Sequence, residues 1–207
     1  RRALEANPRV GAAHYLCGRI LMDVKDRRDA ALDEFRRALE VEPGNEFALV
    51  GQARIAVIEG RHAESIAICD RAEPAGKHLE ELYYVRGSAR VRRREGRDLE
   101  EALKDFTVAI AKRAAPWSHC GRGIAYCLLR RTAEGLVDFD SAIRIDAAYG
   151  LAYKNRGSAR TETGDYDGAR KDLDEAIRLD PNDQIAHLYR GVVRKAKGDV
   201  DGAITDC

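Results

Sequence analysis

The 207 residues suffice for one sizeable domain or one extended array, and 44% hydrophobic with 34% charged residues predicts a folded, soluble chain. Thirty-six basic and 35 acidic side chains leave a net charge of +1, which argues against a general nucleic-acid or membrane-surface binder, because such binders need a one-sided field. No apolar run approaches the roughly 20 residues that a membrane-spanning helix needs.

A short sequence pattern recurs about every 34 residues along the chain. Its clearest copies contain Gly123 and Gly157, which lie 34 residues apart, and Gly191 follows after another 34. A fixed period of this size predicts a stack of helical hairpins, each too small to bury its apolar face without its neighbours. Such a stack is typical of a surface that holds other proteins, and it is rarely a catalyst.

In chain order the pattern predicts a single solenoid over residues 1–207. Residues 1–10 are expected to end a second helix, because Ala3 and Pro8 stand where a later unit has Ala38 and Pro43. Whole units follow at 11–45, 46–79, 80–115, 116–149 and 150–183, and an incomplete unit covers 184–207. Because both ends fall inside helical patterns, we expect a segment of a longer protein.

The unit at 150–183 shows how the sequence specifies two helices. Apolar and small residues recur at steps of three and four, which is helical periodicity. In the second helix these residues are Tyr166, Ala169, Leu173, Ala176 and Ile177. Gly164 separates the helices because glycine readily adopts the dihedral angles of a tight turn. Asp180 ends the second helix, because the residue before a proline is pushed out of the helical region.

Glycine also recurs in the middle of the first helix, where it costs about 1 kcal/mol relative to alanine. Gly123, Gly157 and Gly191 are the examples. A cost repeated in successive copies predicts a close approach of two helix backbones. The second helix is expected to supply a matching shallow surface at Ala109, Ala142 and Ala176.

The spacing of five positions resembles the tetratricopeptide repeat. The five are Gly157, Ala169, Leu173, Ala176 and Pro181 in one unit, and Gly18, Ala31, Phe35, Ala38 and Pro43 in another. The resemblance covers essentially the whole chain and implies an all-α, right-handed superhelical solenoid of antiparallel helix-turn-helix repeats. In such arrays the first helices line a concave groove that usually holds extended peptides or helices. Ala53, Gly135 and Ala147 depart from the family pattern without threatening the helices.

An arginine directly precedes the glycine in four units, and an aspartate recurs on the second helix of the same four. The pairs are Arg86 with Asp105, Arg122 with Asp138, Arg156 with Asp172, and Arg190 with Asp206. The two units without the arginine have Cys17 with Glu34 and Gln52 with Ile68. We therefore predict an ion pair inside each of the four units, because a planar guanidinium can hold a carboxylate with two hydrogen bonds. Ligand binding by these arginines is the alternative.

No catalytic constellation is found, so no enzyme activity, cofactor or metal site is expected. His14, His119 and His187 share one slot with Tyr83 and Tyr153, which predicts a packing position, and His62 shares the slot of Tyr166. The five cysteines are expected to be reduced core thiols because they lack metal-binding spacing; they are Cys17, Cys69, Cys120, Cys127 and Cys207. A reducing compartment and an arginine- and alanine-rich composition favour a bacterial, cytoplasmic setting.

The groove side of the first helices is the candidate binding surface. By their place relative to the repeat glycine, the slots expected to face it hold Tyr15, Arg19, Phe47, Arg54, Tyr84, Ser88, Trp117, Ile124, Lys154, Asn155, Ser158 and Tyr189. Aromatic side chains beside Arg, Lys and Asn fit peptide recognition, since aromatic and arginine side chains dominate binding hot spots. The alternative for each residue is that it merely covers the inner helix surface.

Two further features concern charged ligands. Arg90, Arg92, Arg93, Arg94 and Arg97 form a basic run at a helix end, where cations complement the negative C-terminus, so a solvated face is expected. A phosphate, acidic-peptide or RNA contact is the alternative. Lys154 and Asn155 resemble part of the clamp with which some family members grip chaperone C-termini, but the matching slots of preceding units hold Cys120, Gly121, Tyr84 and Val85, so chaperone-tail binding is not expected.

The combined features favour a protein–protein interaction scaffold that binds a peptide or partner domain in the groove, without nucleic acid and without membrane insertion. Two alternatives stay open. One is a regulatory or targeting segment of a larger enzyme, such as a kinase or transferase, whose catalytic part lies outside this chain. The other is a structural array that self-associates end to end through its incomplete terminal repeats.

Overall fold

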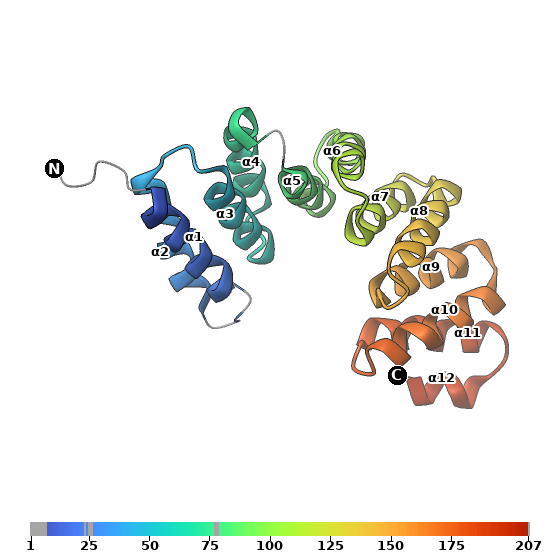
Figure 1. Cartoon of the computed structure of the whole chain (residues 1–207). Helices are drawn as coiled ribbons and strands as arrows, with labels where there is room; N and C mark the ends of the chain where they lie inside the picture. Colours follow the sequence, from blue (N-terminus) through green and yellow to red (C-terminus); the bar gives the residue numbers. More distant parts are fainter. Residues whose placement is uncertain (1–7, 23, 25–26, 77–78, 207) are drawn as a thin grey trace. The chain divides into compact units, whose positions relative to one another are not determined.

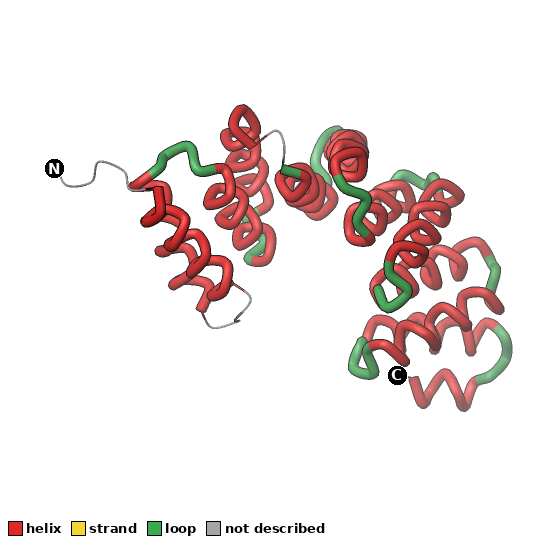
Figure 2. Tube along the Cα trace, in the orientation of Figure 1, coloured by secondary structure: helices red, strands yellow, loops and turns green. Residues whose placement is uncertain are grey.

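The computed structural model describes residues 8–22, 24, 27–76 and 79–206. These residues form twelve α-helices and no strand, joined by short loops (Figures 1 and 2). Consecutive helices pack as hairpins. The hairpins are α1 (Pro8–Met22) with α2 (Arg28–Val41), α3 (Glu46–Ile58) with α4 (His62–Gly76), α5 (Glu80–Arg93) with α6 (Asp98–Lys112), α7 (Pro116–Leu128) with α8 (Thr132–Ile145), α9 (Gly150–Thr163) with α10 (Tyr166–Leu179), and α11 (Gln184–Ala196) with α12 (Val200–Asp206). The predicted all-α repeat fold is confirmed.

The hairpins group into two compact units, one ending at Lys112 and the other beginning at Arg113. The N-terminal unit contains the hairpins from α1 to α6, and the C-terminal unit contains those from α7 to α12. Within each unit, successive hairpins pack against one another, as the repeat period predicts.

The start of the first helix differs from the prediction. Helix α1 begins at Pro8, so residues 8–10 belong to the first hairpin rather than to the end of an earlier second helix. A proline suits the first turn of a helix, because its missing N–H would find no intrahelical partner there and its fixed φ is already helical. Ala3, the other residue behind that prediction, lies outside the described residues.

Large side chains of the second helices fill the space that the mid-helix glycines leave. A Cβ atom built on Gly18 would lie 2.6 Å from the Phe35 ring, and one on Gly157 would lie 2.8 Å from Leu173 Cγ. Gly123 faces Phe139 in the same way, at 2.7 Å. The predicted close approach is therefore mainly one of helix backbone to a core side chain rather than to the small alanines.

The hairpin of α7 and α8 is the exception, because its two backbones do approach closely. A Cβ atom on Gly135 would lie 2.9 Å from the carbonyl oxygen of Gly123 and 2.6 Å from Cys127 Sγ. Gly135 stands where other units have alanine, so its departure from the repeat pattern has a steric reason.

The four predicted Arg–Asp ion pairs are all present. Their N···O distances are 2.9 Å for Arg86–Asp105, 2.8 Å for Arg122–Asp138, 2.6 Å for Arg156–Asp172 and 2.6 Å for Arg190–Asp206. All four aspartates are buried. Each pair joins the first helix of a hairpin to the second, so it fixes the register of the hairpin as well as neutralising a buried carboxylate.

Two further sets of contacts extend these pairs. Each buried aspartate also meets a second cationic or histidine side chain; these partners are Arg90, His119, Arg160 and Arg194. Arg156 also reaches Asp140 of the preceding hairpin at 2.6 Å, and Arg190 reaches Asp174 in the same way at 2.8 Å. One arginine thus connects three helices, which makes these charges a structural network between adjacent hairpins.

At two of these aspartates of the C-terminal unit, Asp138 and Asp206, hydrogen bonds outweigh burial, whereas burial raises the pKa of Asp105 in the N-terminal unit. Burial disfavours the charged form of Asp138, but the hydrogen bonds from His119 and Arg122 outweigh it and hold the pKa of this carboxyl below its usual range. At Asp206 the hydrogen bond from Arg190 is the main effect that outweighs burial, and the pKa of the Asp206 carboxyl is also lowered. Both carboxylates therefore stay charged at neutral pH although they are buried.

Candidate functional site

The twelve predicted groove residues divide equally between the two units. Tyr15, Arg19, Phe47, Arg54, Tyr84 and Ser88 lie on the first helices of the N-terminal unit. Trp117, Ile124, Lys154, Asn155, Ser158 and Tyr189 lie on those of the C-terminal unit.

In the N-terminal unit the predicted residues mostly contact one another or neighbouring helices. The rings of Tyr15 and Phe47 lie 5.5 Å apart between centroids, and the Arg19 guanidinium lies 5.9 Å from the Tyr15 centroid. Arg54 forms an ion pair with Glu81 at 2.8 Å. Tyr84 packs 6.2 Å from the Phe106 ring, and Ser88 is half-buried. These contacts hold the side chains together as a surface patch on the first helices.

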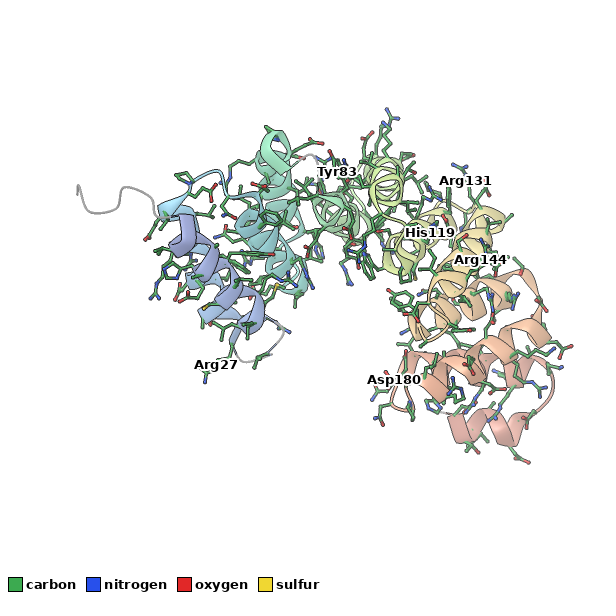
Figure 3. All side chains as sticks on the ribbon, in the orientation of Figure 1. Arg27, Tyr83, His119, Arg131, Arg144 and Asp180 are labelled. Carbon is green, nitrogen blue, oxygen red and sulfur yellow. The ribbon has the colours of Figure 1, made fainter. Side chains whose placement is uncertain are left out.

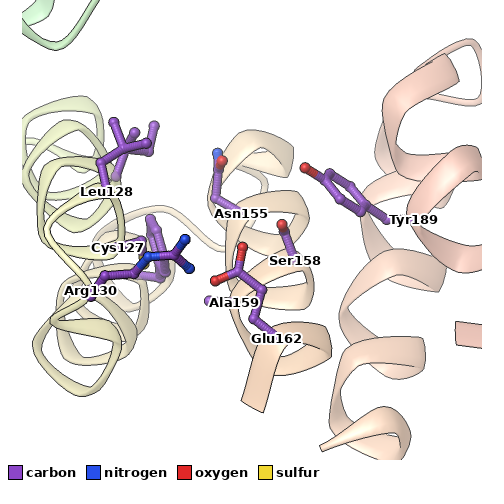
Figure 4. Close-up of a pocket in the computed structure, with 10 residues that line it drawn as sticks. Cys127, Leu128, Arg130, Asn155, Ser158, Ala159, Glu162 and Tyr189 are labelled. Carbon is purple, nitrogen blue, oxygen red and sulfur yellow. The ribbon is translucent and has the colours of Figure 1, made fainter. Parts of the chain in front are cut away.

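The C-terminal unit contains a pocket of about 260 Å³ (Figure 4). Four of the predicted residues line it: Ile124, Asn155, Ser158 and Tyr189. They come from the first helices α7, α9 and α11 of three successive hairpins. The prediction therefore locates the helix faces that form the pocket.

Two predicted residues of this unit do not line the pocket. Lys154 forms an ion pair with Asp183 at 2.6 Å, which links α9 to the start of α11. Trp117 lies against Arg113, whose guanidinium is 5.3 Å from the ring centroid. The lysine that resembles half of a carboxylate clamp is thus already neutralised by an acid of its own chain.

Sequence reasoning missed six lining residues: Cys127, Leu128, Arg130, Phe139, Ala159 and Glu162. Three of them are apolar, and burial raises the pKa of the Cys127 thiol to about 11, so the thiol is neutral as well. Arg130 has a positive φ of 62° at a turn where other hairpins have glycine. In the sequence the only sign of this is that Arg130 stands where other hairpins have glycine, and the replacement by itself does not indicate a pocket.

The pocket combines an apolar wall with polar side chains that the chain itself does not use. Asn155 donates a hydrogen bond to the Leu151 carbonyl at 2.7 Å. The side chains of Arg130, Ser158, Glu162 and Tyr189 form no hydrogen bond or ion pair with any described residue. Such groups are available to a ligand, and a small number of convergent polar groups in an apolar concavity is the usual composition of a binding site.

The histidine slot is more than the packing position that the sequence predicts. His14 lies 2.7 Å from Glu34, and His119, labelled in Figure 3, lies 2.9 Å from Asp138. The two tyrosines in this slot, Tyr83 and Tyr153, instead lie against the guanidinium groups of Arg86 and Arg156. The slot therefore places a polar aromatic ring against the buried charges. His62 has a buried Nδ1 without a partner among the described residues.

The cysteines and the basic run are placed as follows. Cys69 and Cys120 are buried free thiols, whereas Cys17 is exposed and so is not the core thiol that the sequence predicts. Cys207 lies outside the described residues. In the basic run, Arg90 contacts Asp105, Arg93 contacts Asp98, and Arg94 donates to the Val91 carbonyl; Arg92 and Arg97 are exposed. Most of this run is therefore bound within the chain.

None of the helices in the described part of the chain combines the length and apolar character that a membrane span requires.

Comparisons with known proteins agree with the architecture. Residues 24–79 match the family model described as a tetratricopeptide repeat, and residues 157–198 match one described as a TPR repeat. Hsp70-Hsp90 organizing protein 2 of Arabidopsis thaliana is 28% identical over a region that covers 55% of this chain and 21% of that protein.

Solved structures of similar fold extend over more of the chain. A chain of the APC/C hetero-tetramer Cut9-Hcn1 superposes with a TM-score of 0.86 at 19% identity, covering 97% of this chain and 39% of that one. YrrB, described as a TPR protein with an unusual peptide-binding site, superposes with a TM-score of 0.62 at 20% identity, covering 87% and 91%. The chain thus spans about a fifth of its curated relative and well under half of the Cut9-Hcn1 chain.

Proposed function

The chain is an array of tetratricopeptide repeats, and we propose that it is a protein–protein interaction scaffold whose C-terminal unit binds a peptide segment in the pocket between α7, α9 and α11. Repeats of this type typically serve as extended surfaces for other proteins. The observation that carries the proposal is the convergence of Asn155, Ser158 and Tyr189 on one apolar concavity.

Most other charged groups on the first helices already have partners within the chain. Arg54 is paired with Glu81, Lys154 with Asp183, and Arg156 with Asp172. A residue in such a pair must lose its partner before it binds a ligand, whereas Ser158 and Tyr189 of the pocket need not. This difference favours the pocket over the rest of the predicted groove as the working surface.

The size of the pocket favours a peptide over a small metabolite. Pockets for drug-sized ligands measure about 300–1,000 Å³. The volume here, about 260 Å³, falls below that range and suits one or two side chains of a larger ligand. The peptide-binding site reported for YrrB lies on the same type of fold and supports this proposal.

The proposal predicts that Tyr189→Ala weakens peptide binding by about tenfold or more, since tyrosine is a typical hot-spot residue. Nine-residue peptides with random sequence are selected by display on the whole chain, and the affinity of the selected peptides is measured by fluorescence anisotropy. Arg144→Ala, on the exposed surface of α8, is the control and should bind as the wild type does. Equal binding by both variants would place the site elsewhere, and no selected peptide at all would contradict peptide binding.

One observation favours self-association as a second candidate function. Ile20 on α1 and Ile204 on α12, in the first and last helices, are 71% and 69% exposed. In the interior of the array, the position of Ile20 is filled by Ile55, which is fully buried. Exposed apolar faces of this kind are typical of interaction sites.

If the array self-associates, its mass by light scattering should rise with concentration, and Ile20→Glu should return it to a monomer. The substitution adds a charge to a side chain that is already exposed, so the fold should persist, which circular dichroism checks. A monomeric mass at every concentration would exclude this second function.

A further inference from the structure

An arginine occupies a turn position that three other hairpins assign to glycine. Arg130, between α7 and α8, has φ of 62°, while Gly60, Gly164 and Gly198 have φ of 79°, 83° and 85°. The backbone hydrogen bonds are the same, since Arg131 N–H donates to the Tyr126 carbonyl just as the residue after Gly164 donates to the Arg160 carbonyl. Only the residue type differs.

This replacement is unfavourable for the fold. The left-handed region brings Cβ too close to the carbonyl oxygen, so a side chain there destabilises a turn that glycine would form without strain. Residues held in such conformations concentrate at functional sites. Because the turn itself does not need an arginine, a function of the Arg130 side chain would explain why this strained residue is present.

The side chain of Arg130 lines the pocket and points toward Glu162 of α9 (Figure 4). Among the described residues, neither side chain forms an ion pair or a hydrogen bond. The pocket therefore presents one hydrogen-bond-donating cation and one accepting anion beside an apolar wall formed by Ile124, Leu128 and Phe139. The charges of Arg130 and Glu162 cancel, so the net charge of the pocket lining is zero.

We infer that Arg130 is a ligand-binding residue, and that the pocket takes one uncharged apolar side chain of leucine size from an extended peptide. The inference rests on the proposed function and specifies the ligand. The peptide backbone beside this anchor offers a carbonyl oxygen to the Arg130 guanidinium and an N–H to the Glu162 carboxylate. A peptide is suited to this arrangement because every residue carries both groups.

Charge complementarity decides the type of anchor. Arg130 and Glu162 line the same pocket, so an acidic or a basic anchor would meet a like charge as well as an opposite one, and it would lose water against the apolar wall. A neutral apolar side chain avoids both penalties and gains from burial in proportion to its area. The volume of the pocket limits the occupant to this scale.

The test uses two matched glycine substitutions on the whole chain. Arg130→Gly should raise the melting temperature by roughly 2 °C, because it relieves the left-handed strain, and should weaken peptide binding about tenfold. Arg94→Gly is the control, because Arg94 also has a positive φ, of 57°, but belongs to the N-terminal unit and does not line the pocket. It should stabilise the chain similarly and leave binding unchanged.

The probes are fluorescein-labelled nine-residue peptide pools with random flanks and a central residue fixed as Leu, Asp or Lys. The wild type should prefer the Leu pool, and Arg130→Gly should lose that affinity. Equal binding of the three pools, or full affinity in Arg130→Gly, overturns the inference. If Tyr189→Ala still abolishes binding in that case, the proposed function stands without it. If no pool binds the wild type, both fail.

Discussion

Replacing Asp172 by alanine is expected to destabilise the C-terminal unit by about 3 kcal/mol, because it leaves two half-buried guanidinium groups without their carboxylate. The side chain of Asp172 is 4% exposed and accepts hydrogen bonds from Arg156 and Arg160. A double-mutant cycle with Arg156→Ala should give a coupling free energy above 1 kcal/mol, as an order of magnitude, since the two groups meet through two hydrogen bonds. Urea denaturation of the four proteins provides these free energies.

The matched control lies on the same helix. Arg178 and Glu175 on α10 also form two hydrogen bonds, but the Arg178 side chain is 66% exposed. Exposed pairs of this kind contribute little to stability, because water screens them. If the Arg156–Asp172 coupling is no larger than the Arg178–Glu175 coupling, the buried network does not hold the hairpins together as the geometry indicates.

These pairs could be predicted from the sequence because the repeats allow equivalent positions to be compared within one chain. Asp172 was assigned to Arg156 since arginine and aspartate occur together in four units and are both absent from two. The same reasoning could have predicted the second contact of these arginines, with an aspartate of the preceding hairpin, but this contact was missed. Asp70, Asp140 and Asp174 each lie 16 residues before an arginine that they contact. Comparing positions only within single units does not reveal this spacing, because the aspartate and the arginine belong to different units.

The pocket was only partly predictable from the sequence, because most of its lining residues lie outside the slots that the repeat pattern assigned to the groove. Periodicity placed Asn155, Ser158 and Tyr189 on the helix faces that line it. It gave no information on which predicted side chains were already paired, and so it did not separate Lys154 from Asn155. Arg130 was missed because its position reads as a loop, and the left-handed φ that makes it unusual appears only in three dimensions.

Replacing Phe35 by alanine is expected to destabilise the N-terminal unit by about 3–5 kcal/mol, because the ring fills the space between two hairpins. Phe35 is fully buried, and glycines of two successive first helices make room for it. A Cβ atom on Gly18 would lie 2.6 Å from the ring, and one on Gly51 would lie 2.5 Å from it. Truncation therefore opens a cavity lined by both hairpins, which neither can close by moving alone.

The chain itself offers the graded control for this effect. Leu173 fills the same slot in the hairpin of α9 and α10, so Phe35→Leu should keep most of the contact and destabilise by less than about 1.5 kcal/mol. Ile58→Ala, at an exposed site on α3, should change stability by no more than about 0.5 kcal/mol. Chemical denaturation followed by circular dichroism measures all three. Equal losses for the leucine and alanine variants of Phe35 would mean that the ring does not join the hairpins, and that the glycines at 18 and 51 need another explanation.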